Sequence, residues 1–375
     1  MNLRTTTFFV LALALTYRLL RGRATGKPSE IRTVAVANFT GNLGDMIFTT
    51  PVFRAIKVAY PKTRVIVIGS KKNGLFLEGS TDIDRYLVWT EFWASLRALR
   101  TERPDVGIAV NPSPLEVGML YLAGASLITV YTHLSVITRA WRLLSTLVHT
   151  MPYTPGKYVA KEYLRLLEPA GIRSDDTNKH VPLLAEVRTA VKNMLVEKGF
   201  LETGKKLVAL SPTAGLDARE WPPERFGQVA RHVVEKYGAS FVLVGGKFEG
   251  RERDAFFAAL PPHARVLDFL MKPLEETKAL VALSSLIIAN DSGLVYVAEA
   301  FGVPTLVIAG VHDSNEHPRR TTINRVVDAP VRHITLHTIT SDLVKVDMEK
   351  AREQMRSITT EAVIRELDSL WPNLK

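Results

Sequence analysis

The sequence predicts an α/β protein with two halves, each built on a parallel sheet that helices cover on both faces. Short runs of β-branched residues, such as TVAVANF, RVIVIG and SFVLVGG, alternate along the chain with longer helical patterns. Buried strands that alternate with helices indicate βαβ units, and therefore parallel sheets. The 375 residues give a prior of about two to three domains, and two halves of about 150 residues each are consistent with it.

The first half is expected to hold strands at residues 33–39, 64–69 and 105–110. Residues 115–151 form a long apolar stretch, which is expected to be helical with an interruption near Gly124. A further helical stretch, KYVAKEYLRLLEPAGI, closes this half.

The second half begins near Pro182 and is expected to hold five strands, with the sequences KLVALSP, SFVLVGG, ARVLDF, LIIAN and PTLVIAG. The segment PPERFGQVARHVVEKYG has proline at its start and glycine at its end, as the termini of a helix prefer. Residues 312–325 are polar and basic without periodicity and are interpreted as a loop, whereas residues 359–370 are expected to be helical.

The composition excludes several kinds of chemistry. The chain has no cysteine, which rules out a disulfide scaffold, a thiolate zinc site, an iron–sulfur cluster and a cysteine nucleophile. Its 48 Lys and Arg residues exceed its 38 Asp and Glu residues, for a net charge of +10. This excess suits an acidic partner such as phosphate, nucleic acid or an anionic membrane surface. Nucleic acid is disfavoured, because the basic residues are dispersed and do not alternate with aromatic ones.

The first 30 residues combine an apolar run with basic residues. The run, residues 8–15, is too short to span a bilayer, which takes about 20 residues. Basic residues follow it, which favours keeping the next domain on the cytoplasmic side: Arg18, Arg21, Arg23 and Lys27. We therefore expect a short amphipathic or interfacial helix that rests on the membrane; a signal peptide and a frayed tail are the alternatives.

Three loops could carry chemistry, and the first is NFTGNLGDMIFTTP, at residues 38–51. It joins a strand to a helix, where free backbone N–H groups and the helix dipole favour anions. Gly41 and Gly44 would let the backbone approach a ligand. Asp45 is interpreted either as an N-cap or as a catalytic base.

The second loop, SPTAGLDAREWPPERF at residues 211–226, also joins a strand to a helix. It offers the hydroxyls of Ser211 and Thr213, and Arg219 as a cation that could meet phosphate or could simply be solvated. Trp221 is expected to be a core anchor.

The third loop, ANDSGLVYVAEAFGVP at residues 289–304, has Asp291 and Ser292 where a strand ends and a helix begins. The amides of Ser292 and Gly293 would point at an anion there, and capping alone could also explain Asp291. Three such loops at the carboxyl ends of parallel strands predict a ligand site, because open α/β sheets bind ligands at that edge.

Together and in this order, the three loops resemble glycosyltransferase family 9, the heptosyltransferases of lipopolysaccharide core synthesis. GNLGDMIFTTPVFRAIKVAYP is similar to the family's GD-containing loop followed by TxPVxRALKxxYP, and SPTAGLDAREWPPERF to its small-residue loop, basic residue and WPxERF. FVLVGGKFE and NDSGLVYVAEAFGVPTLVIAG resemble VVLxGGxxE and DSGxxHLAxAxGxPTxxxFG. The resemblance runs from about Ile31 to Leu370.

The resemblance implies a GT-B fold, with two Rossmann-like domains facing a central cleft. The implied division is a membrane-associating segment at 1–30, an acceptor domain at 31–181, a donor domain at 182–345 and a helical C-terminal segment at 346–375. The implied reaction is inverting transfer of a heptose-like sugar from a nucleotide sugar, ADP-heptose in the first instance, to a lipopolysaccharide-core or related acidic glycolipid. No metal or other cofactor is obligatory in such folds.

The resemblance also implies roles for individual residues. Asp45 matches the proposed general base, and Arg219 falls on the basic residue that binds phosphate. Further residues fall on the family's donor site: Thr213, Glu249, Asp291, Ser292, Gly293 and Tyr296. Tyr296 replaces the family's histidine and cannot carry a positive charge at neutral pH, and the late loop GVHDSNEHPRR is unusual.

Two matters stay open at this point. On the acceptor side, near Gly44, an acidic acceptor would suit a basic cluster formed by Lys57, Arg64, Lys71 and Lys72, unless these residues are a solvated face. The altered Tyr296 leaves the alternative of a non-catalytic protein that binds nucleotide sugars or glycans and kept the fold. A GT-B-like sugar epimerase lacks support from these motifs.

Overall fold

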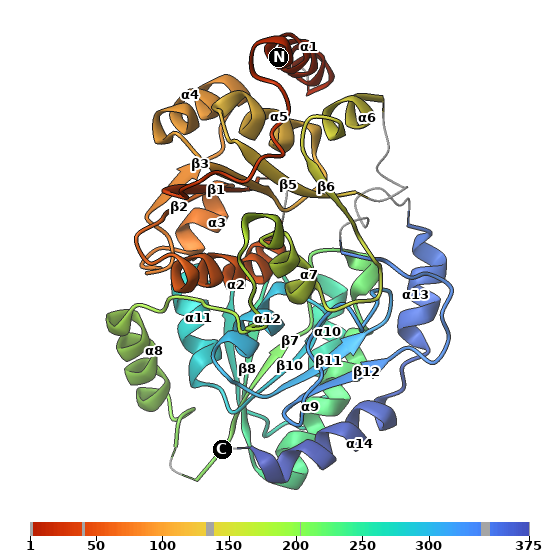
Figure 1. Cartoon of the computed structure of the whole chain (residues 1–375). Helices are drawn as coiled ribbons and strands as arrows, with labels where there is room; N and C mark the ends of the chain where they lie inside the picture. The colour runs from red at the N-terminus through yellow and green to blue at the C-terminus, as the bar shows by residue number, and fades with distance from the viewer. Residues whose placement is uncertain (1–2, 40–41, 133–138, 203, 339–345, 375) are drawn as a thin grey trace. The chain divides into compact units, whose positions relative to one another are not determined.

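The computed structural model describes residues 3–39, 42–132, 139–202, 204–338 and 346–374. The described residues form two compact units (Figure 1), one ending at Pro182 and the other beginning at Leu183. Each unit has its own six-stranded sheet in which every pairing is parallel. The predicted α/β class with parallel sheets is therefore confirmed.

The sheet of the first unit has the order β3-β2-β1-β4-β5-β6. Its strands are β1 (Thr33–Asn38), β2 (Arg64–Gly69), β3 (Arg85–Val88), β4 (Val106–Ala109), β5 (Leu127–Thr132) and β6 (His149–Pro152). The expectation that residues 115–151 are wholly helical was wrong, because β5 and β6 lie within them. The β-branched run LITVYT forms β5, and an apolar run of this length fits a buried strand as well as a helix.

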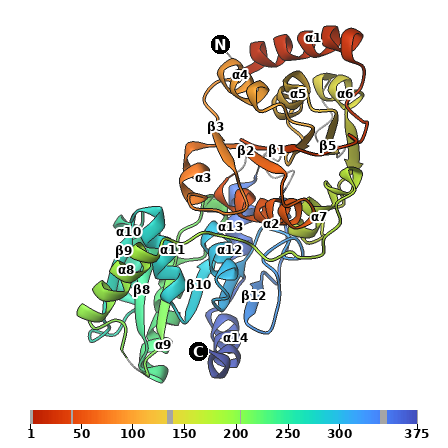
Figure 2. The same cartoon turned by 60° about the vertical axis from the view of Figure 1, so that its left-hand side comes forward.

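Helices cover both faces of this sheet (Figures 1 and 2). One face carries α4 (Phe92–Glu102), α5 (Pro114–Ala123) and α6 (Arg139–Ser145). The other face carries α2 (Leu43–Ala59), α3 (Lys71–Phe76) and α7 (Val159–Arg165). Because both faces are covered, the central strands are buried along their whole length, as the burial of all six residues of β1 shows.

The N-terminal helix α1 (Leu3–Arg21) forms an additional outer layer on α5 (Figure 2). Its residues Val10 and Ala14 are fully buried. The Arg21 guanidinium donates to the Tyr121 carbonyl at 2.9 Å, and the Tyr17 and Tyr121 rings meet edge to face at 6.1 Å. The expected helix is thus present and packed, and a frayed tail is wrong for the described residues. No helix in the described part of the chain is long and apolar enough to cross a bilayer.

The second unit repeats the same plan. Its sheet has the order β12-β11-β10-β7-β8-β9, with β7 (Leu207–Ser211), β8 (Ser240–Gly245), β9 (Val266–Leu270), β10 (Leu286–Asn290), β11 (Thr305–Ala309) and β12 (Asn324–Asp328). Its helices are α8 (Ala185–Glu197), α9 (Pro223–Tyr237), α10 (Gly250–Ala258), α11 (Leu274–Leu283), α12 (Gly293–Ala300), α13 (Met348–Arg356) and α14 (Thr360–Leu370). The five expected strands are all present, and β12 is one that the sequence reasoning missed.

In both units the chain adds strands to one side of the first strand, β1 or β7, and then crosses to its other side. This reversal of the strand order lies between β1 and β4 in the first unit and between β7 and β10 in the second. Loops at the carboxyl ends of these two strand pairs diverge and leave a crevice between them, and ligands of open α/β sheets bind there. The three loops singled out from the sequence follow β1, β7 and β10.

Asp368 ties the C-terminal helix α14 to α9. Its carboxylate accepts hydrogen bonds of 2.7 Å from Lys236 and Tyr237 and lies 2.7 Å from Nε2 of His232. Burial would raise the pKa of Asp368, but these partners outweigh burial and lower it to about 2. A carboxylate whose pKa is depressed in the folded state stabilises that state above the unfolded pKa of about 3.9. This stabilisation is lost as the pH falls toward 2.

Replacing Asp368 with asparagine is therefore expected to lower the free energy of unfolding by about 1 kcal/mol at neutral pH, a value reduced for the partial exposure of the site. The loss should shrink as the pH approaches 2, where the wild-type carboxylate is protonated as well. Urea unfolding of both proteins across this pH range checks it. Asp254→Asn, at an exposed residue of α10, serves as the control and should change stability little. A loss that does not depend on pH would contradict the assignment.

Candidate active site

The loop between β10 and α12 gathers buried polar side chains around Asp291. Asp291 follows the last residue of β10 and is 2% exposed. Its Oδ1 accepts a hydrogen bond from the Tyr296 hydroxyl and lies 3.3 Å from Nδ1 of His317. Its Oδ2 lies 3.9 Å from an Arg219 nitrogen and 3.7 Å from Nδ1 of His312. The carboxylate is thus the centre of a compact polar cluster within the second unit.

Four separate segments build this cluster. Arg219 ends a short 3₁₀ helix, Asp217–Arg219, after β7, and Tyr296 lies in the first turn of α12. His312 and His317 come from the loop that follows β11, and Nδ1 of His317 lies 2.6 Å from the Tyr296 hydroxyl. Sequence reasoning did not single out the two histidines, because their loop has no periodicity. The signal that could have found them is the histidine pair in the unusual segment GVHDSNEHPRR.

Electrostatics fix the charge states in the cluster. Burial alone would raise the pKa of Asp291, but the neighbouring His317 and Arg219 outweigh burial and hold that pKa well below its usual range. Burial, together with the charge of Asp291, raises the pKa of Tyr296 well above 10, so its hydroxyl remains a hydrogen-bond donor. Burial and the neighbouring positive groups lower the pKa of His312 well below 6.5, which makes its imidazole neutral at physiological pH.

Several buried atoms of this region have no hydrogen-bond partner among the described residues. They are Ser211 Oγ, Arg219 Nε, Asp291 Oδ2, Ser292 Oγ and His312 Nδ1. Leaving a buried polar group unsatisfied costs about 1–3 kcal/mol, so native proteins rarely do it without a reason. A polar ligand at the carboxyl ends of β7 and β10 would satisfy them. Ser292 is also the residue before the first turn of α12, where backbone N–H groups are free to bind an anion.

The loops after β7 and β8 meet beside this cluster. The Thr213 hydroxyl accepts a hydrogen bond of 3.2 Å from the Gly246 amide. Gly245 has φ of +129°, and a Cβ there would lie 3.0 Å from Ser211 Oγ and 3.1 Å from Thr213 Oγ1. Glycine is therefore required at this close approach. Glu249 is exposed at the start of α10 and pairs with Lys247 at 2.5 Å.

Asp291, His312 and His317 also form a group that could offer ligands to a metal ion, since their ligand atoms lie within 4.8 Å of one another. A cation there would have to compete with the Arg219 guanidinium and with the hydrogen bond from Tyr296 for the same carboxylate. One positive charge already lies beside Asp291, so a metal ion there would be a second cation on the same carboxylate.

Trp221 has the structural role expected of it. Its side chain is 1% exposed, its indole N–H donates to the Ile358 carbonyl at 2.9 Å, and its ring meets that of Phe226 edge to face at 5.2 Å. Its backbone N–H donates to Asn290 Oδ1 at 3.0 Å, and the Asn290 amide donates to the Pro212 carbonyl. The anchored tryptophan thereby holds the loop that carries Arg219 next to β10.

In the first unit, Asp45 lies at the start of α2, after β1. The N-cap of α2 is Asn42, so the interpretation of Asp45 as the N-cap was wrong. Asp45 is the third residue of the helix. Its Oδ2 accepts a hydrogen bond of 2.8 Å from the Asn42 N–H. Gly44 is the second residue of α2. Asp45 is partly exposed, so its carboxylate combines a capping contact with access from outside.

Buried side chains support this loop at the β1–β4 reversal. Glu116 is fully buried and accepts hydrogen bonds from the Phe39 and Asn111 amides, at 3.1 and 3.4 Å. The Asn111 side chain donates to Asn38 Oδ1 at 3.2 Å. The two loops at the reversal are thus tied together, as their counterparts are in the second unit.

The four basic residues considered on the acceptor side do not form one cluster. Arg64 begins β2 and pairs with Glu102 at 2.7 Å, and Lys57, near the C-terminal end of α2, pairs with Asp84 at 2.6 Å. Both lie at the end of the sheet opposite to Asp45, because α2 starts at the carboxyl edge and runs back. Lys71 and Lys72 begin α3, just past the carboxyl end of β2, and both are exposed.

Two doubly wound units, each with polar side chains at the carboxyl edge of its own sheet, are the architecture of the GT-B fold class. A family model described as glycosyltransferase family 9 (heptosyltransferase) matches residues 116–337. The chain belongs to this family. The predicted family and fold are therefore confirmed, and the alternative of a non-catalytic protein is not supported.

Relatives of known structure or function agree with this assignment. The lipopolysaccharide heptosyltransferase 2 of Salmonella typhimurium is 22% identical over 88% of this chain and 95% of its own length. A glycosyltransferase family 9 structure from Veillonella parvula aligns with a TM-score of 0.69 and 18% identity, over 91% of this chain and 97% of that one. The E. coli ADP-heptose lps heptosyltransferase II aligns with a TM-score of 0.65 and 16% identity, over 90% and 100%.

Proposed function

We propose that the protein transfers a heptose-like sugar, with inversion, from ADP-heptose to a lipopolysaccharide-core glycolipid. Membership of family 9 supports the transfer, and the names of the similar heptosyltransferases from Salmonella and E. coli support the sugar, the nucleotide and the acceptor. The observation that carries the donor site is the buried cluster around Asp291, with its unsatisfied polar atoms at the β7–β10 reversal.

In the donor site, Arg219 and the amides of Ser292 and Gly293 would bind the diphosphate. As the bond between the anomeric carbon and the diphosphate oxygen breaks, negative charge grows on the leaving oxygen. A guanidinium and preorganised N–H groups stabilise that charge in the transition state. Asp291 would hold Arg219 in place, and Thr213 and Glu249 would contact the donor from the β7 and β8 sides.

Tyr296 and His317 together would do the work that the resemblance assigns to one histidine. The Tyr296 hydroxyl bridges Asp291 and His317, so an imidazole reaches the same carboxylate from another loop. The loop after β11 would then supply an imidazole that hydrogen-bonds beside the diphosphate.

On the acceptor side, Asp45 would act as the general base. The acceptor hydroxyl oxygen attacks the anomeric carbon from the face opposite the diphosphate, and its proton passes to the Asp45 carboxylate. Lys71 and Lys72 are exposed cations just past the carboxyl end of β2 in the same sheet, and they would contact an acidic acceptor. Peripheral attachment to the cytoplasmic face of the inner membrane, through residues 1–30, is part of the proposal.

Thermal unfolding with a panel of donors tests the nucleotide and the sugar. A ligand that binds only the folded state at 100 times its Kd stabilises that state by about 2.7 kcal/mol. We expect ADP-heptose to raise the unfolding temperature more than ADP-glucose, and UDP-, GDP- and dTDP-sugars to raise it little. The shift should persist in EDTA, because Arg219 and the helix N-terminus would supply the positive charge. A larger shift with another nucleotide would overturn the choice of ADP.

A further inference from the structure

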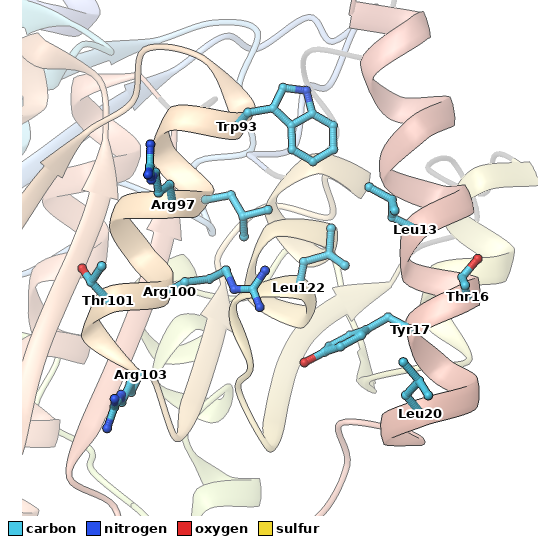
Figure 3. A pocket seen from close by; sticks show the side chains of 11 residues that line it. Leu13, Thr16, Tyr17, Leu20, Trp93, Arg97, Arg100, Thr101, Arg103 and Leu122 are labelled. Carbon is cyan, nitrogen blue, oxygen red and sulfur yellow. The ribbon is translucent and has the colours of Figure 1, made fainter.

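A groove lies between α1 and α4 on the outer surface of the first unit, remote in sequence from every residue assigned to transfer. Its volume is about 790 Å³. Apolar side chains supply its walls: Leu13, Tyr17 and Leu20 from α1, Trp93 and Leu96 from α4, and Leu122 from α5. Figure 3 shows Trp93 and Arg100 extending from α4, and Leu13 and Tyr17 from α1, toward one another across the opening.

Three arginines border the groove along α4. Trp93, Arg97 and Arg100 recur at i, i+4 and i+7 and therefore share one face of the helix. Arg103 is the residue at its C-terminal end. All three arginines are exposed, and no ion pair is found for them within the described residues. An anion at this rim would meet no competing carboxylate on α4, because Glu102 is buried and paired with Arg64 and Arg85.

The apolar surface continues from the groove along α1. Large apolar side chains are exposed there to an unusual degree: Phe8 at 68%, Phe9 at 47%, Leu19 at 86% and Leu20 at 85%. The helix has no acidic residue, and Arg18 is exposed among these side chains. Isolated exposed apolar residues are ordinary, but a contiguous patch marks a surface that meets a partner or a membrane.

We propose that this groove binds a phospholipid of an anionic bilayer, with an acyl chain between α1 and α4 and the phosphate on Arg97, Arg100 and Arg103. The apolar walls suit an acyl chain, and the unpaired arginines suit an anionic headgroup. The exposed leucines and phenylalanines of α1 enter the interface beside that lipid, as an interfacial helix does. The proposal extends the membrane contact beyond residues 1–30 to α4, and it does not depend on the donor or the acceptor.

The packing of α1 explains why the groove persists without a lipid. Val10 meets α5 so closely that a Cβ at Gly118 would lie 2.3 Å from Val10 Cγ1. Arg21 bonds to the carbonyls of Tyr121 and Gly124, and the Tyr121 hydroxyl bonds to the Gly22 carbonyl. One face of α1 therefore packs on α5, and another face borders the groove toward α4 and the surface.

Vesicle flotation tests the charge part of the proposal. The full chain is expected to float with vesicles of equal parts phosphatidylglycerol and phosphatidylcholine, and far less with phosphatidylcholine alone. Each basic residue near an anionic surface contributes about fivefold to binding, so the triple variant R97Q/R100Q/R103Q should bind about 100-fold more weakly. The matched control R188Q/R231Q/R365Q removes three exposed charges from the second unit and should float like the wild type.

Tryptophan quenching tests the groove itself. Phosphatidylglycerol with brominated acyl chains should quench the emission of Trp93, which is 38% exposed. Trp93→Phe should remove most of the quenched emission, and Trp371→Phe in the second unit should leave it. Unchanged unfolding temperatures and donor-induced shifts establish that each variant is folded. Equal flotation of the triple variant and the wild type, equal losses in variant and control, or no quenching of Trp93 would each overturn the proposal.

Discussion

Replacing Asp45 with asparagine is expected to lower the turnover number for sugar transfer by about 100- to 10,000-fold, the range that a positioned general base contributes. The amide oxygen of asparagine can still accept the hydrogen bond from the Asn42 N–H, which the carboxylate accepts at 2.8 Å. The start of α2 should therefore stay intact while the base is lost. The measurement is the rate of ADP release from ADP-heptose in the presence of a core glycolipid acceptor.

A second variant separates the base from the capping contact. Asp45→Ala loses the hydrogen bond to Asn42 as well, and loss of such a contact at a helix start costs about 0.5–2 kcal/mol. Both variants should lose transfer, but only the alanine variant should unfold at a lower temperature. Both should keep the stabilisation by ADP-heptose, since Asp45 lies in the first unit. If Asp45→Asn turns over at the wild-type rate, Asp45 is a capping residue and no base.

The sequence predicted a strand correctly where a short β-branched run is followed by a clear helical pattern. The runs at β1, β2, β7 and β8 are short and β-branched, and each is followed by a helix with clear end signals. β5 and β6 were missed because they lie in a long apolar stretch, where periodicity cannot separate a buried strand from a helix. β12 was missed because it is an edge strand that pairs only with β11. Its strand conformation depends on that pairing more than on its own sequence.

The site residues could be predicted where they lie in a loop that directly joins a strand to a helix. Asp291 and Ser292 stand at a strand–helix junction, and Arg219 stands in the loop after β7, so their motifs could be read directly. His312 and His317 reach the same carboxylate only because the loop after β11 folds back onto it. The predicted basic cluster was wrong because residues that are close in sequence can lie far apart in the fold. Lys57 and Arg64 are near Lys71 in sequence but lie at the other end of the sheet.

Replacing Arg219 with alanine is expected to lower the turnover number by about 100- to 1,000-fold, as removal of one preorganised donor to a developing negative charge does. The guanidinium lies 3.9 Å from Asp291, its side chain is 23% exposed, and its Nε has no hydrogen-bond partner among the described residues. It therefore lies beside the loop that leads into α12, and its Nε–H is left for a ligand. ADP should also bind more weakly, because the same donors contact the ground-state diphosphate.

The effect of Arg219→Lys distinguishes a role in transfer from a role in structure. Lysine keeps one positive charge but lacks the planar fork of donors, so it should restore part of the rate and of the affinity for ADP. Arg251→Ala, which removes an exposed charge from α10, should leave both unchanged. Arg219→Ala also leaves the buried Asp291 carboxylate with fewer cationic neighbours, so its pKa should rise. A variant that loses stability, but keeps its turnover number and its affinity for ADP, would show that Arg219 only balances the charge of Asp291.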